Sequence, residues 1–224
     1  MRHLFFLALA AMVFSLFTMS AMGQDERNKA EFFAGYSYLN SDIGFDEDID
    51  AEGVSSDFDD RLGMHGFEAA ITGNFHRYVG AKFDFSMHTK TKTFSELIKS
   101  EGGTYDYRLK LRTNQFLGGL QFKDNKKEGG RFRPFAHVLA GVANQKITFS
   151  DSIPVEGSIS SDSISKNSFA MVFGGGVDVH VGKRVDIRLF QIDFNPIFMK
   201  ADSDLDIGSH TQKNFRISAG VVFH

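Results

Sequence analysis

Cysteine and tryptophan are absent from this sequence of 224 residues, and proline occurs only 3 times. Without cysteine the chain forms no disulfide bond, and it offers no thiolate as a nucleophile or as a metal ligand. Phenylalanine and glycine are abundant instead, with 25 and 22 residues. This composition favours β-structure, and the length allows one large domain or two small ones.

An excess of basic residues is also lacking. The chain has 25 Lys and Arg residues against 28 Asp and Glu residues, so its formal net charge is −3. A nucleic-acid-binding surface requires clustered positive charge, and the sequence therefore predicts no nucleic-acid partner. Long apolar runs are lacking too, because none after residue 23 is long enough for a transmembrane helix.

The first 23 residues have the organisation of a cleaved secretory signal peptide. Arg2 supplies the positive charge, and a largely apolar stretch covers residues 4–17. Ala21 and Gly23 are the small residues expected before a cleavage site. An uncleaved membrane anchor is the alternative, but the apolar core is short and ends abruptly. We therefore predict an exported protein whose mature chain spans residues 24–224.

Eight segments of the mature chain alternate between apolar and other residues with a period of two. This alternation is typical of β-strands with two unlike faces. Phe83 and Phe85, for example, lie on one face of their segment, whereas Lys82 and Asp84 lie on the other. The segments are residues 31–39, 66–75, 78–88, 114–122, 133–143, 169–181, 184–194 and 214–224.

The two faces predict an eight-stranded, antiparallel, up-and-down transmembrane β-barrel. One face carries aromatic and branched residues, and the other carries glycine, small polar residues and charges. In a membrane barrel the apolar face contacts lipid and the polar face lines the interior. A soluble periplasmic, lipocalin-like binding barrel is the alternative, but its apolar face would surround a ligand. The charges on the small-residue face favour the membrane barrel.

The connections between the segments alternate between short and long. Residues 76–77, 123–131 and 182–183 form the shorter links. The longer polar stretches are expected to be loops and cover residues 40–63, 89–108, 147–167 and 197–213. Outer-membrane barrels have short periplasmic turns and long external loops in this order. The sequence therefore predicts a protein of the bacterial outer membrane.

Charged residues on the small-residue face are predicted to line the barrel interior. They are Glu68, Lys82, Asp84, Asp178, His180, Asp186, Arg188 and Arg216. An eight-stranded barrel is just wide enough for its own side chains to fill it, and buried charges persist only when they are paired. We therefore expect a structural charge network. The alternative is a narrow, gated ion path along the same residues, with gaps at Gly80, Gly174 and Gly176.

Asp193 does not fit the alternation of its segment, because its parity is opposite to that of Asp186 and Arg188. Two explanations are open. A β-bulge near Phe190 and Gln191 would turn Asp193 inward, or Asp193 lies beyond the hydrocarbon, where ionised groups cost little.

Three stretches of the chain, RPFAHVLAGV, GGGVDVHVGKRVDIRLFQIDF and FRISAGVVF, resemble the later strands of eight-stranded outer-membrane β-barrels of the OmpA/OmpX type. The resemblance covers essentially all of residues 24–224. It implies a monomer in contact with outer-membrane lipid and lipopolysaccharide, inserted by the barrel-assembly machinery and needing no cofactor. The chain departs from the family in two ways. His224 follows the last aromatic residue, and the peptidoglycan-binding domain of OmpA-type proteins is missing.

Catalysis is not expected. Outer-membrane lipid A deacylases place a His and a Ser two residues apart on one strand, and a nucleophile needs such a base beside it. A Ser with this spacing follows none of His65, His76, His88, His137, His180 and His210. The leading hypothesis is a structural or surface-interaction protein that acts through its external loops. A small pore for ions or solutes is the alternative.

The first of the four long polar stretches, residues 40–63, is acidic. Its carboxylates alternate as at the start of a calcium-binding EF-hand loop. The candidate calcium ligands are Asp46, Asp48, Asp50 and Glu52. Ala51 stands where that loop needs glycine, however, and Asp57 replaces its final glutamate. The match predicts at most weak calcium binding, and a solvated loop is the alternative.

The serine-rich residues 150–168 contain alternating Ile and Val. A flexible surface loop is the preferred interpretation. An extended hairpin that offers an edge to binding partners is the alternative.

Overall fold

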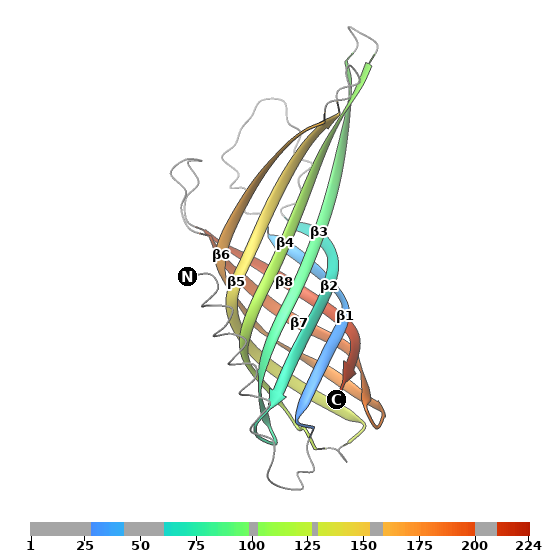
Figure 1. Cartoon of the computed structure of the whole chain (residues 1–224), viewed down its shortest axis with the longest axis vertical. Helices are drawn as coiled ribbons and strands as arrows, with labels where there is room; N and C mark the ends of the chain where they lie inside the picture. The colour runs from blue at the N-terminus through green and yellow to red at the C-terminus, as the bar shows by residue number, and fades with distance from the viewer. Residues whose placement is uncertain (1–27, 43–60, 99–102, 127–129, 153–158, 200–209) are drawn as a thin grey trace.

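A computed structural model describes residues 28–42, 61–98, 103–126, 130–152, 159–199 and 210–224. Its strands are β1 (Ala30–Asp42), β2 (Arg61–Asn74), β3 (Val79–Ile98), β4 (Gly103–Lys123), β5 (Phe132–Ser152), β6 (Ile159–Gly182), β7 (Val185–Met199) and β8 (His210–Phe223). Each strand pairs antiparallel with the next, and β8 pairs with β1 (Figure 1). The predicted eight-stranded antiparallel barrel is confirmed.

The two faces of the wall lie as the alternation predicts. Large apolar side chains point outward, and Phe116 is 60% and Ile71 53% exposed. Charged side chains point inward, and Glu68 and Arg216 are completely buried. The lipocalin-like alternative is therefore wrong, because a soluble barrel would need the apolar face inside.

The predicted signal peptide lies outside the described residues. Within the described part of the chain, no helix is long and apolar enough to cross a lipid bilayer.

The barrel has two unlike ends. The connections β2–β3, β4–β5 and β6–β7 lie at one end, which we call the short-turn end, and the start of β1 and the end of β8 lie there as well (Figure 1). Short turns of outer-membrane barrels face the periplasm, so this end faces the periplasm and the other faces the exterior.

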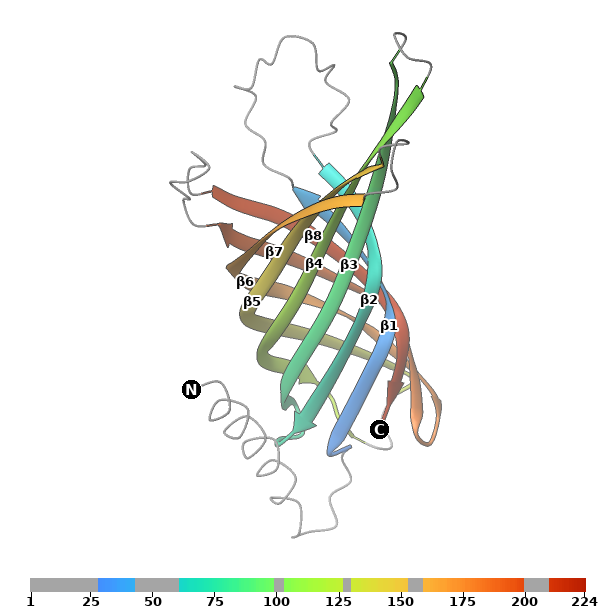
Figure 2. The same ribbon diagram turned by 45° about the horizontal axis from the view of Figure 1, so that its top comes forward.

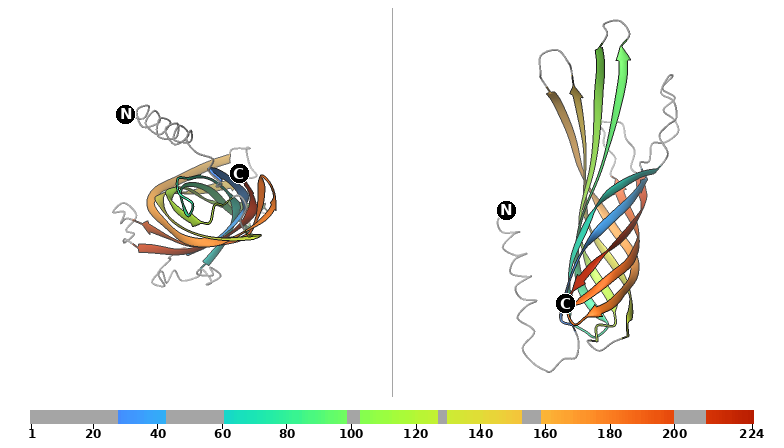
Figure 3. Two further views of the ribbon diagram at one scale, coloured as in Figure 1. Left: turned by 90° about the horizontal axis from the view of Figure 1, so that it is seen from below. Right: turned by 90° about the vertical axis from the view of Figure 1, so that its right-hand side faces the viewer.

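Four strands are much longer than the sequence indicates. β3, β4, β5 and β6 contain 20, 21, 21 and 24 residues, whereas the other four contain 13 to 15. Their outer parts project from the barrel as a sheet, which we call the projecting sheet (Figures 2 and 3). The expectation of loops at residues 89–108 and 147–167 is wrong, because strand pairing continues to Ile98↔Gly103 and Ser152↔Ile159.

The preferred interpretation of residues 150–168 as a flexible loop is wrong for the same reason, because β5 and β6 pair through most of this stretch. The polar composition suggested a loop. A polar segment nevertheless forms a strand where a neighbouring strand supplies its hydrogen bonds, since β-propensity depends strongly on context.

A β-bulge in β7 resolves the position of Asp193. β7 has Arg188 opposite Gly220 and Gln191 opposite Ser218, so one extra residue is inserted between these pairs. Leu189 and Phe190 consequently both point outward, with 52% and 45% exposure. The parity of the strand changes at this point, and Asp193 is completely buried in the interior. The predicted bulge is confirmed, and the alternative position beyond the hydrocarbon is wrong.

Apolar residues also fill parts of the interior. Leu117, Leu139, Val172 and Ile197 form a buried cluster on the exterior side of the charged residues. Phe33 and Val222 form another toward the short-turn end. Apolar side chains therefore share the interior with the charges, whereas the sequence predicted only glycine, small polar residues and charges on this face.

Candidate functional site

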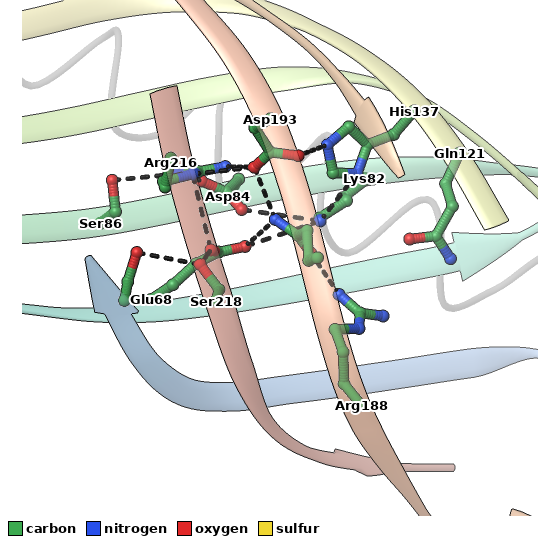
Figure 4. A network of polar contacts seen from close by, with 12 residues as sticks. Glu68, Lys82, Asp84, Ser86, Gln121, His137, Arg188, Asp193, Arg216 and Ser218 are labelled. Carbon is green, nitrogen blue, oxygen red and sulfur yellow. Dashed lines mark hydrogen bonds and ion pairs between the residues drawn. The ribbon is translucent and has the colours of Figure 1, made fainter. Parts of the chain in front are cut away.

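A network of buried charges lies in the middle of the barrel. We call it the central network, and it consists of Glu68, Lys82, Asp84, Asp193 and Arg216 (Figure 4). These residues come from β2, β3, β7 and β8 and meet because inward-facing positions of a narrow barrel converge on its axis. Three carboxylates face two cations, so one formal negative charge is not matched within the set.

Arg216 is the hub of the central network. Its guanidinium donates to an Asp193 oxygen from Nε at 2.9 Å and lies within 2.8 Å of the same oxygen through a second nitrogen. A third nitrogen donates to Asp84 at 2.9 Å and to Ser86 at 3.1 Å. Glu68 lies 3.6 Å away. Such forked contacts to carboxylates suit the planar guanidinium and hold the side chain in one orientation.

Lys82 and His137 link the same carboxylates from the opposite side. The Lys82 ammonium lies 3.6 Å from Asp84 and 3.8 Å from Glu68 and donates to His137 Nδ1 at 3.2 Å. His137 Nε2 in turn donates to Asp193 at 2.9 Å. The imidazole therefore bridges a cation and an anion, which uses both of its ring nitrogens.

A second group of charges lies nearer the short-turn end. Arg188 donates to both oxygens of Asp178, at 2.8 and 3.2 Å, and Lys123 donates to Asp178 at 2.8 Å and to Glu31 at 3.0 Å. The guanidinium carbon of Arg188 also lies 4.3 Å from the ring centre of Phe33 and 4.0 Å from that of Phe135. Ion pairs and cation–π contacts together anchor this side chain.

A third group closes the short-turn end, and we call it the terminal cluster. It consists of His180, Asp186, Arg133 and His224. His180 Nδ1 donates to Asp186 at 2.7 Å, and Arg133 donates to the other Asp186 oxygen at 3.3 Å. Burial lowers the pKa of His224, although the carboxylates of Asp186 and Glu31 oppose that shift.

The structure places all eight sequence-predicted interior residues inside the barrel, in these three groups. Seven are fully enclosed, whereas the His180 side chain is 30% exposed at the short-turn end. The structure adds further charged residues, namely Glu31, Lys123, Arg133, His137 and Asp193. Parity along each strand would have found Glu31 and His137. The bulge hid Asp193, and Lys123 was assigned to a connection.

The glycine positions named as potential gaps are occupied by neighbouring atoms. A side chain at Gly174 would collide with the Asp193 carboxylate, and one at Gly176 would collide with the Phe190 carbonyl. A side chain at Gly80 would collide with the amide oxygen of Asn74. These glycines therefore make room for close packing, and Gly174 specifically admits Asp193 to the central network.

One His–Ser pair forms that the spacing along the chain did not reveal. His88 Nε2 lies 2.8 Å from the Ser37 hydroxyl, and Ser218 links Ser37 to Glu68. Catalysis of acyl transfer needs an acid on the other imidazole nitrogen and access for a substrate. His88 Nδ1 has no hydrogen-bond partner among the described residues, and both side chains are completely buried. The pair therefore resembles a structural contact.

The candidate calcium ligands, residues 46–52, lie outside the described part of the chain.

Comparison with protein families matches residues 6–223 to the outer membrane protein beta-barrel domain. The chain belongs to this family. The family and the barrel together place the protein in the bacterial outer membrane, as predicted. No curated protein sequence matches the chain.

Several solved outer-membrane structures are similar to this family member. Ail, the attachment invasion locus protein of Yersinia pestis, solved in complex with the heparin analogue sucrose octasulfate, is 17% identical with a TM-score of 0.45, over 88% of this chain and 100% of Ail. Neisserial surface protein A is 11% identical with a TM-score of 0.46, over 89% and 99% of the two chains. OprG from Pseudomonas aeruginosa is 11% identical with a TM-score of 0.45, over 89% and 97%. At these identities the similarity concerns the fold alone.

Proposed function

We propose that this barrel is a non-enzymatic, monomeric surface-interaction protein. In this proposal the closed barrel is a rigid anchor, and the foot of the projecting sheet binds the phosphate-bearing lipopolysaccharide of the outer leaflet. The observation that carries the proposal is a set of outward-facing cations directly above the lipid-facing apolar band.

The outward face of β4 and β5 changes in character along the strands. Phe116 and Val142 pair in the apolar band and are exposed, and Asn114 and Asn144 form the next outward pair. Arg112 and Lys146 follow as the pair after that. Successive outward positions thus pass from apolar to amide to cationic, the order expected where a wall leaves hydrocarbon and meets lipid phosphate.

The cations continue along the same face. Lys110 and Arg108 occupy the next two outward positions of β4. On the opposite face, Lys90, Lys92 and Lys166 lie at the same level of the sheet. Residues 89–92, 108–112, 144–148 and 163–168 contain these seven Lys and Arg residues and no Asp or Glu. We call the outward set, Arg108, Lys110, Arg112 and Lys146, the basic ladder.

The experiment compares the wild-type barrel with a triple variant, Lys110→Gln, Arg112→Gln and Lys146→Gln. Binding to immobilised lipopolysaccharide is measured with the full chain in detergent, at low and at physiological salt. Each cation near an anionic membrane surface contributes about 1 kcal/mol, so three substitutions are expected to weaken binding roughly 100-fold. Lipopolysaccharide without its phosphates is expected to bind the wild type as weakly as the triple variant.

A matched control removes three exposed cations from the short-turn end, through Arg131→Gln, Lys183→Gln and Arg184→Gln. Its net charge equals that of the triple variant, but the cations that it lacks lie at the end of the barrel away from the outer leaflet, so it is expected to bind lipopolysaccharide as the wild type does. Equal binding by both triple variants would contradict the proposal, because net charge alone would then explain the affinity.

A small pore is the second candidate function. Several buried polar atoms inside the barrel have no hydrogen-bond partner among the described residues, including Gln115 Nε2, Gln121 Oε1 and Asn195 Oδ1. Buried polar atoms of this kind are sites at which water binds. Conductance across a planar lipid bilayer separates the two candidates. A steady conductance that Arg216→Met alters would favour the pore, and a silent bilayer favours the anchor.

A further inference from the structure

We infer that the terminal cluster binds a divalent transition-metal ion of the zinc type through His180, Asp186 and His224. This inference does not depend on the proposed function, because the cluster lies at the end of the barrel opposite to the projecting sheet. The sequence alone predicted no metal site here.

Three strand ends bring the ligands together. His180 near the end of β6 lies opposite Asp186 near the start of β7, and Asp186 lies opposite Val222 of β8. The backbone N–H of His224 donates to the Arg184 carbonyl at 3.1 Å, which holds the residue after β8 against β7. The position of His224 is therefore determined by backbone contacts and not only by its side chain.

The three potential ligand atoms lie near one another. One ligand atom from each of the three residues lies within 4.8 Å of the other two. Zinc binds imidazole nitrogen and carboxylate oxygen at about 2.0–2.2 Å in a tetrahedral arrangement, so two of its ligand atoms lie roughly 3.3–3.6 Å apart. The two imidazole rings are stacked with their centres 6.1 Å apart. Metal binding therefore requires the three ligand atoms to move closer together, by up to about 1 Å.

His224 supplies the second, independent observation. Its side chain is only 3% exposed, yet its Nδ1 makes no hydrogen bond with the described residues and lies 3.9 Å from Asp186 Oδ2. A buried polar atom without a partner is costly, and native structures usually satisfy it with protein, water or an ion. This nitrogen lies near the same carboxylate group that His180 contacts.

The donor set and its access agree with zinc chemistry. Two imidazoles and one carboxylate leave a fourth position open, as in zinc sites with three protein ligands. The partial exposure of His180 provides an entry path from the short-turn end. An ion there takes the place of the hydrogen bond between His180 and Asp186. It joins β6, β7 and the residue after β8, next to the pairing of β8 with β1 that closes the barrel.

Arg133 competes with the ion. Its guanidinium donates to Asp186 Oδ2 at 3.3 Å, and its positive charge opposes a second cation nearby. The structure therefore predicts that Arg133→Gln strengthens metal binding, whereas loss of either histidine weakens it. Opposite effects from neighbouring substitutions are not expected for non-specific binding to the surface.

The experiment uses the full chain in detergent, stripped of metal with a chelator and titrated with Zn²⁺ in a calorimeter. The variants are His180→Ala, His224→Ala and Arg133→Gln. His76→Ala is the matched control, because His76 is an exposed histidine of the same end. The heat-dependent shift in gel mobility shows that each variant is folded. We expect one saturable site in the wild type and in His76→Ala.

Removal of either histidine ligand should weaken binding at least about 10- to 100-fold, the loss that changing even an outer-shell partner causes. Co²⁺ in place of Zn²⁺ should give a visible absorption spectrum that both histidine variants lose. Absence of saturable binding in the folded wild type would overturn the inference. Unchanged binding in both histidine variants, with displacement by Ca²⁺, would also overturn it and would place the ion on acidic residues elsewhere.

Discussion

At the scale of single residues, Arg216 shows how the barrel tolerates buried charge. Its guanidinium contacts Asp84, Asp193 and Glu68, and all four side chains are buried. A buried ion pair contributes little net stability, but removal of one partner leaves an uncompensated charge. Loss of Arg216 therefore deprives three buried carboxylates of a cation, whereas loss of one carboxylate leaves Arg216 in contact with the other two.

Replacement of Arg216 by Met is expected to lower the free energy of unfolding by about 3–5 kcal/mol, because three buried carboxylates would then share Lys82 alone. Urea titration of the barrel in lipid vesicles measures the change. Addition of Asp193→Asn should restore part of the loss. Arg77→Met is the control, since Arg77 pairs with Asp124 at the surface, and its cost is expected to stay below about 1 kcal/mol. Equal losses in Arg216→Met and Arg77→Met would refute the role of the network.

At the scale of elements, the β-bulge decides which residues of β7 enter the interior. It places two consecutive apolar residues, Leu189 and Phe190, on the lipid face and returns Gln191 and Asp193 to the interior. Gln191 donates to Glu68 at 2.9 Å and to Asp193 at 2.7 Å. The bulge in β7 thus brings two side chains, Gln191 and Asp193, into the hydrogen-bonded centre of the barrel.

Deletion of Leu189 is expected to leave a regular strand with unchanged faces, because Arg188 and Gln191 would still oppose Gly220 and Ser218. Deletion of Ile192 instead moves Asp193 to the lipid face or Phe190 to the interior, since a shift of one residue exchanges the faces of a strand. The heat-dependent gel shift of outer-membrane fractions measures the folded share of each variant. Loss of the shift in both deletions would show that the extra residue is needed for another reason.

At the scale of the whole molecule, the direction of the two faces sets the environment of every side chain. Val138 lies on the outward face of β5, opposite Leu120 and Phe173, and is 44% exposed. In a soluble protein such a position tolerates a charge, whereas in the bilayer it does not.

Replacement of Val138 by Arg is expected to cost about 2–4 kcal/mol of unfolding free energy in lipid vesicles, the cost of such a charge near the bilayer midplane. Thr148→Arg, on the same face of β5 but in the projecting sheet, is the matched control and should cost less than about 1 kcal/mol, through repulsion from Lys110 opposite it. Similar effects at the two positions would contradict the placement of the apolar band in the membrane.

The sequence by itself determined the number of barrel strands, their two faces and the membrane that they span. Alternation with a period of two survives any packing, because successive side chains of a strand always point to opposite sides. For the same reason the eight predicted interior charges lie inside, and even the bulge in β7 was visible as a break in parity at Asp193.

Only the tertiary structure decided the rest. The length of β3 to β6 depends on hydrogen bonds from neighbouring strands. Polar residues such as Thr91 and Ser165 therefore lie in strands, although the polar composition of their segments predicted loops. Pairing inside the barrel depends on strand order, tilt and register, which bring Arg216 to Asp84 and His224 to Asp186 across large separations in the chain. Contacts of this kind are set by closure of the barrel, and no local pattern along the chain encodes them.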